Sequence, residues 1–79
     1  MLKVLAEQEH YLLVSDGKCF TVVERRASRF YALRNGIRHG FELNDAELIR
    51  QSAAYSEDDA RELLARVATQ WRDLCEHVR

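Results

Sequence analysis

The clearest pattern of apolar and polar positions covers residues 56–79. Apolar residues recur there every three or four positions, and a step of 100° per residue gathers them into an arc of roughly 140° that no charged residue enters from residue 60 onwards. This spacing predicts one long amphipathic helix, with Trp71 near the centre of the arc as its main contact with the rest of the fold. The arc consists of Ala60, Leu63, Leu64, Val67, Ala68, Trp71, Leu74, Cys75 and Val78.

Two uses of that arc are open. It can be the core face of the helix, or part of it can be an interface for another protein, where tryptophan is also enriched. The candidate residues for either use are Leu63, Leu64, Val67, Trp71, Leu74 and Cys75. The start of the helix is well marked, because Ser56 is a suitable N-cap and residues 57–59 are acidic, which favours the positive end of the helix dipole.

Turn signals precede the helix and divide the chain into strands. Asp16-Gly17 lies between residues 9–15 and 18–24 and is typical of a two-residue hairpin turn. Such a turn would pair Leu13 with Phe20 and give both faces of the hairpin an apolar character. Residues 29–34 and 37–43 flank a second signal of this kind, Asn35-Gly36.

The second hairpin has one apolar face and one face rich in arginine. Its predicted register places Phe30 opposite Phe41 and Arg29 opposite Glu42. With residues 2–7 as a first strand, the chain gives three to five antiparallel strands. Residues 46–53 then predict a short helix before the long C-terminal helix. Asn44 or Asp45 would cap it, and its apolar side would consist of Ala46, Ile49 and Ala53. The expected fold is an α+β domain in which the long helix packs on an antiparallel meander.

One long helix can cover only one face of this sheet. Because both faces of the first hairpin are apolar, a second cover is required. The short helix, a curled sheet or a second copy of the chain could supply it, and exposed edge strands also invite pairing. A homodimer is therefore one of the expected arrangements.

Length and composition favour a single domain over residues 1–79. A chain of 79 residues supports only one core, and 47% hydrophobic with 32% charged residues is an ordinary globular composition. The longest apolar run, residues 11–14, is too short to span a membrane, and we expect a cytoplasmic protein. Cys19 and Cys75 lie far apart in the sequence and are expected to be reduced thiols.

The net charge of −1 conceals an uneven distribution. Residues 18–40 carry a lysine and five arginines against Glu24 alone, whereas residues 41–62 carry seven acidic residues against two arginines. The basic segment suggests an anion or nucleic-acid face, in which Tyr31 would stack on a base while guanidinium groups hold phosphates. Internal pairing of the same side chains, such as Arg29 with Glu42, is the alternative. The candidate face consists of Arg25, Arg26, Arg29, Arg34, Arg38 and Tyr31.

Motifs for catalysis, metals or cofactors do not stand out. The histidines and cysteines lack the usual spacings of metal ligands, and the serines lack the sequence context of a nucleophile. We therefore predict a non-enzymatic interaction module without a metal or cofactor: a regulatory, adaptor or inhibitor protein that acts through protein–protein contacts. The alternative is a small nucleic-acid-binding domain that uses the arginine-rich second hairpin.

Overall fold

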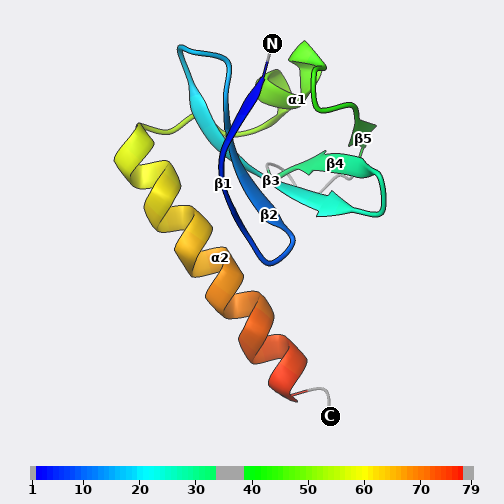
Figure 1. Ribbon diagram of the computed structural model, residues 1–79, viewed down its shortest axis with the longest axis vertical. Helices are drawn as coiled ribbons and strands as arrows, with labels where there is room; N and C mark the ends of the chain where they lie inside the picture. The colour runs from blue at the N-terminus through cyan, green and yellow to red at the C-terminus, as the bar shows by residue number, and fades with distance from the viewer. Residues whose placement is uncertain (1, 34–38, 78–79) are drawn as a thin grey trace.

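Five antiparallel strands, each hydrogen-bonded to its neighbours in the chain, form the sheet in the computed structural model, which describes residues 2–33 and 39–77. A short helix and a long helix follow the sheet (Figure 1). The predicted α+β meander with a helix packed on it is confirmed. The elements are β1 (Lys3–Gln8), β2 (Tyr11–Ser15), β3 (Phe20–Arg26), β4 (Arg29–Ala32), β5 (Gly40–Phe41), α1 (Ala46–Gln51) and α2 (Glu57–His77).

The β2–β3 hairpin differs in register from the prediction. Leu13 lies opposite Val22 instead of Phe20, because the connection covers residues 16–19 rather than two residues. The carboxylate of Asp16 accepts hydrogen bonds from the backbone N–H groups of Lys18 and Cys19, both at 2.9 Å, and so holds the wider turn. Since partners moved by two positions, every side chain keeps its predicted face.

Two turns of the predicted meander were not located from the sequence. Gln8 pairs with Tyr11 around the β1–β2 turn, and Arg26 pairs with Arg29 around the β3–β4 turn. The first turn residue has a positive φ in each, 56° at residue 9 and 53° at residue 27. Glutamate and alanine occupy these positions, so the glycine or asparagine that usually signals such a turn is missing.

The predicted register of the second hairpin is correct where the structure describes it. Phe30 lies opposite Phe41 in the β4–β5 ladder, and Arg29 forms an ion pair with Glu42 at 3.1 Å. The predicted Asn35-Gly36 turn lies outside the described residues.

The long helix covers one face of the sheet. Leu13 and Val22 from the central strands form a buried cluster with Ala60 and Leu64 of α2. Ser56 caps α2 as predicted, since its hydroxyl accepts the N–H of Asp59 at 3.2 Å. This cluster is one of two cores.

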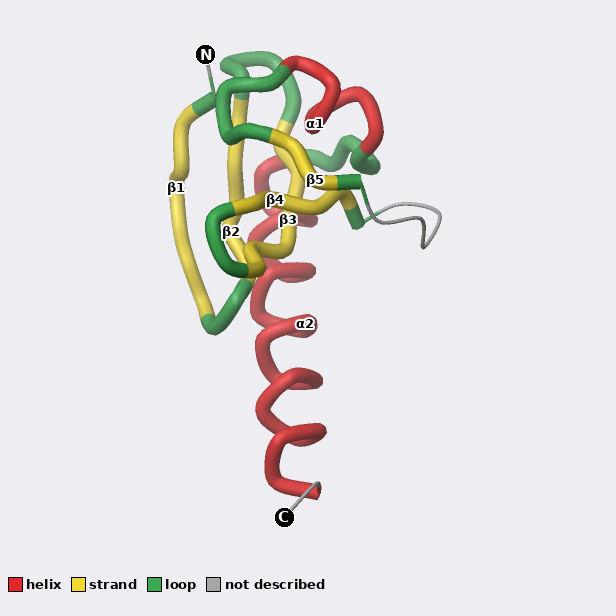
Figure 2. The backbone as a smooth tube through the Cα atoms, turned by 90° about the vertical axis from the view of Figure 1, so that its right-hand side faces the viewer, coloured by secondary structure: helices red, strands yellow, loops and turns green. Residues whose placement is uncertain are grey.

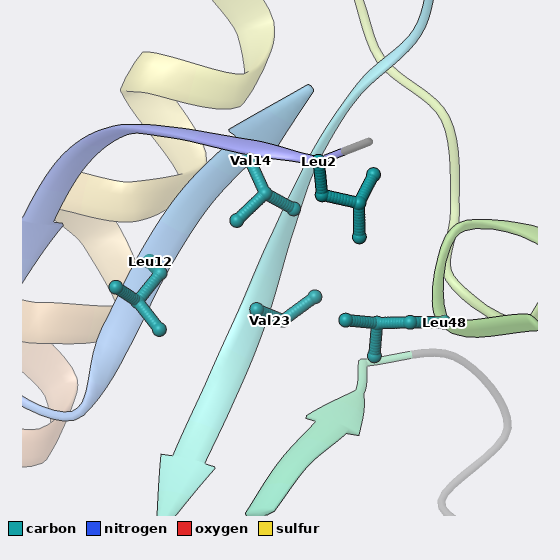
Figure 3. Packing of buried hydrophobic residues seen from close by; sticks show 5 residues of the cluster. All are labelled: Leu2, Leu12, Val14, Val23 and Leu48. Atoms are coloured by element: carbon teal, nitrogen blue, oxygen red, sulfur yellow. The ribbon is translucent and has the colours of Figure 1, made fainter. Parts of the chain in front are cut away.

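The short helix covers the opposite face. Leu48 of α1 is 0% exposed and packs with Val14 and Val23 of the sheet (Figure 3). Asp45 is the N-cap, as one of the predicted alternatives had it. The expected apolar side of this helix, built on Ala46, Ile49 and Ala53, was wrong in detail because Leu48 is the fully buried residue. The short helix, one of the three expected covers for the second face, thus packs on it.

Candidate interaction surface

The apolar arc of α2 is buried near the start of the helix and exposed towards its end. Leu64 is 2% exposed, and Ala60 and Ala68 are fully buried, whereas Leu74 is 60% exposed and Cys75 is also exposed. Figures 1 and 2 both show α2 extending well past the sheet. Of the two uses left open by the sequence, the arc is therefore the core face of the helix as far as Ala68, whereas its last turns are exposed. Leu63 and Val67 lie between these extremes and are half-buried against the core.

Trp71 marks the point at which α2 leaves the sheet. It is half-buried, and the His10 ring meets it edge-on with ring centroids 4.8 Å apart. Its neighbour Arg72 pairs with Glu9 at 3.3 Å. Trp71 was predicted to be the main contact of the helix with the rest of the fold, and it packs on the β1–β2 turn because the strands end before the helix does. Residues 69–77 are called the distal part of α2 below.

Each described arginine of the candidate anion face has a carboxylate partner. Arg25 pairs with Glu7 at 2.5 Å, and Arg26 pairs at 2.6 Å with Glu24, which is buried. Arg29 forms the ion pair with Glu42 and also donates a hydrogen bond to the carbonyl of residue 40. A phosphate would have to compete with these carboxylates.

The structure brings together only some residues of the candidate anion face. Arg26 and Arg29 are cross-strand partners on the face that carries α2, and Tyr31 lies half-buried beside them, opposite Glu24. Arg25 follows the alternation of β3 onto the other face. Arg34 and Arg38 lie outside the described residues.

A shallow pocket of about 570 Å³ lies between Trp71, the β1–β2 turn and the β3–β4 turn. This pocket could not be predicted from the sequence, because neither turn carries a recognisable turn signal and His10 looked like an isolated histidine. Its walls bear both signs of charge, with Arg26 already bound to the buried carboxylate. The lining residues are His10, Glu24, Arg25, Arg26, Ala27 and Trp71.

The edge strand β1 has a second exposed apolar area. Val4 and Leu5 are 43% and 41% exposed, and the pairing with β2 is interrupted between Val4 and Ala6 by a bulge. A bulge in an edge strand disrupts the flat row of backbone groups that another strand would use. The β1 edge is therefore a poorer binding surface for another protein than the distal part of α2.

The two cysteines are separate free thiols, and only Cys19 is even partly buried. Hydrogen bonds from the backbone N–H groups of Cys19 and Lys18 lower the pKa of Asp16 below its usual 3.8.

Among the described residues, no group of three or more His, Cys, Asp or Glu side chains is placed to hold a metal ion. None of the described helices is both long enough and apolar enough to cross a membrane.

Comparisons of the chain with models of known protein families, with curated proteins and with solved structures find no significant match. The candidate surface therefore rests on the geometry of this chain alone.

Proposed function

We propose that this protein is a non-enzymatic interaction module that acts through protein–protein contacts made by the distal part of α2. The observation that carries the proposal is the 60% exposure of Leu74 on an arc that no charged residue enters from Ala60 onwards. Cys75 and the outer part of Trp71 extend the same apolar surface. A contiguous apolar surface of this kind is typical of a site where another protein binds. A regulatory, adaptor or inhibitor role would use it in the same way.

The arrangement of the arginines favours this proposal over a nucleic-acid-binding role. Arg25, Arg26 and Arg29 each pair with a carboxylate of the same chain. Phosphate binding usually relies on a cluster of cations with a larger net positive charge. The chain has a net charge of −1.

The test is capture of partners from the native lysate by the tagged wild-type protein and two variants. Leu74→Asp places a charge on the exposed part of the arc. Thr69→Asp places the same charge on the opposite, exposed side of the helix and serves as the matched control. We expect the wild type and Thr69→Asp to capture the same proteins, and Leu74→Asp to lose them.

Nuclease treatment and added salt separate the two candidate functions. Contacts made through apolar area should change little with either treatment, whereas phosphate-driven binding falls steeply as salt is added. Capture that survives in Leu74→Asp, or that disappears with nuclease, would contradict the proposal.

A further inference from the structure

The β3–β4 turn carries a serine that follows two arginines. Arg25 and Arg26 end β3, Ala27 and Ser28 form the turn, and β4 begins at Arg29. Arginines two and three residues before a serine are a charge pattern that one class of protein kinases selects, because acidic side chains in the kinase groove accept the forked N–H donors of each guanidinium. No other serine of the chain has two arginines at this spacing.

The groups that such a kinase reads are accessible at this turn. Ser28 is exposed, and Figure 1 shows its turn at the tip of the β3–β4 hairpin. The side chains of Arg25 and Arg26 are 42% and 49% exposed. Their ion pairs with Glu7 and Glu24 each use one nitrogen of the guanidinium, Nη2 in Arg25 and Nε in Arg26. Because a guanidinium has five N–H donors, each arginine can bind a second carboxylate.

The β3–β4 turn can open locally while the rest of the sheet stays paired. Ala27 has a φ of 53°, a left-handed conformation that is unfavourable for a residue with a Cβ atom. The pair that closes the turn, Arg26 opposite Arg29, brings together two like charges, and each side chain binds a carboxylate elsewhere. Opening the turn relieves the strain at Ala27 and extends the chain around Ser28, so that it can enter a substrate groove.

We propose that Ser28 is a phosphorylation site for an arginine-directed serine/threonine kinase. The Oγ atom of Ser28 attacks the γ-phosphorus of a nucleoside triphosphate and forms a new O–P bond. The bond from that phosphorus to the β,γ-bridging oxygen breaks, the nucleoside diphosphate leaves, and an aspartate of the kinase accepts the hydroxyl proton. The proposal does not rest on the proposed function, because it concerns the turn and not the distal part of α2.

Phosphorylation at this turn changes the charge of the pocket beside Trp71. Ala27 lines that pocket next to Ser28, and its charged lining residues are Arg25, Arg26 and Glu24. A phosphoserine adds a charge of about −1.5 to −2 at pH 7. The rim of the pocket thus becomes negative where it was positive.

The test is incubation of the full chain with an arginine-directed serine/threonine kinase and ATP, followed by mass spectrometry of the digested protein. We expect one phosphate, on Ser28. Ser56 serves as an internal control, because it is also exposed but has no arginine among the three residues before it, and it should stay unmodified. Arg25→Gln should slow the phosphorylation of Ser28 about tenfold, because a charge-assisted hydrogen bond to the kinase is lost.

Arg61→Gln is the matched control for the loss of an exposed arginine. Arg61 pairs with Glu57 on α2 at 3.0 Å, so the variant loses a comparable ion pair but keeps the sequence before Ser28, and its rate should equal that of the wild type. Circular dichroism checks that both variants fold. The proposal would be overturned if Ser28 of the folded chain stayed unmodified, whether or not a peptide of residues 22–31 reacted. Equal modification of Ser56, or an unchanged rate in Arg25→Gln, would also overturn it.

Discussion

Leu64 and Leu74 share the apolar arc of α2, and replacing each by alanine distinguishes its buried part from its exposed part. Leu64 is 2% exposed and packs with Leu13 and Val22 of the sheet. Removing a buried leucine side chain costs about 2–5 kcal/mol of unfolding free energy, because apolar burial is lost and a cavity remains. We expect about 3 kcal/mol for Leu64→Ala, since two sheet residues line the space.

That loss is large for a chain of this length. At about 0.05–0.15 kcal/mol per residue, the whole domain has an unfolding free energy of about 4–12 kcal/mol. Leu74→Ala, in contrast, shortens a side chain that is 60% exposed and should change the unfolding free energy of the monomer by no more than about 0.5 kcal/mol.

Urea unfolding measures both values. Trp71 is the only tryptophan of the chain, so its fluorescence reports the contact of α2 with the β1–β2 turn, while far-ultraviolet circular dichroism reports the strands and helices. The measurement needs several protein concentrations, because a dimer makes apparent stability depend on concentration. Equal losses for Leu64→Ala and Leu74→Ala at the lowest concentration would refute the reasoning and show that the distal arc is buried within one chain.

Three further changes test other parts of the fold. Leu48→Ala should cost about 2–5 kcal/mol by urea unfolding, because it empties the core under α1; a loss below about 1 kcal/mol would contradict that core. Thr21→Val keeps the shape of a buried side chain but removes its 2.6 Å hydrogen bond to the Ala53 carbonyl, and the same assay should show a loss of about 1–2 kcal/mol. Asp16 should titrate by carbon NMR with a pKa below 3.8, because its charged form accepts two backbone hydrogen bonds; its stabilisation is present above that value and is lost as the pH falls through the lowered pKa. A midpoint at or above 3.8 would rule out this turn geometry.

Features of the fold that follow from the periodicity of apolar residues alone could be predicted from the sequence. The period of the apolar positions identified α2, and the pairing of Phe30 with Phe41 followed from alternation along two strands. Register around Asp16 could not be predicted, because the carboxylate competes with the backbone for the N–H groups of the turn and widens it. The turns at Glu9 and Ala27 were missed because these residues have no local preference for a positive φ, which is imposed by the pairing of the strands around them.

The apolar arc that forms the candidate surface could be predicted from the sequence, but its exposed part could not. The arc of α2 could be drawn from the sequence, but its periodicity does not say how far the sheet reaches along it. The end of β1 and the start of β2 decide that limit, and they place His10 beside Trp71. Exposure of Leu74 is thus a property of strand length, which the helix sequence does not encode.

The order of the strands has a consequence for folding kinetics. Every strand pairs with its neighbour in the chain, so the sheet is built mainly from contacts between residues close in sequence, and such contacts form quickly. The contacts of α2 with β1, β2 and β3 join distant parts of the chain and should form after the main barrier. Weakening them would then leave the folding rate nearly unchanged, and a loss of about 3 kcal/mol at Leu64 would raise the unfolding rate about a hundredfold.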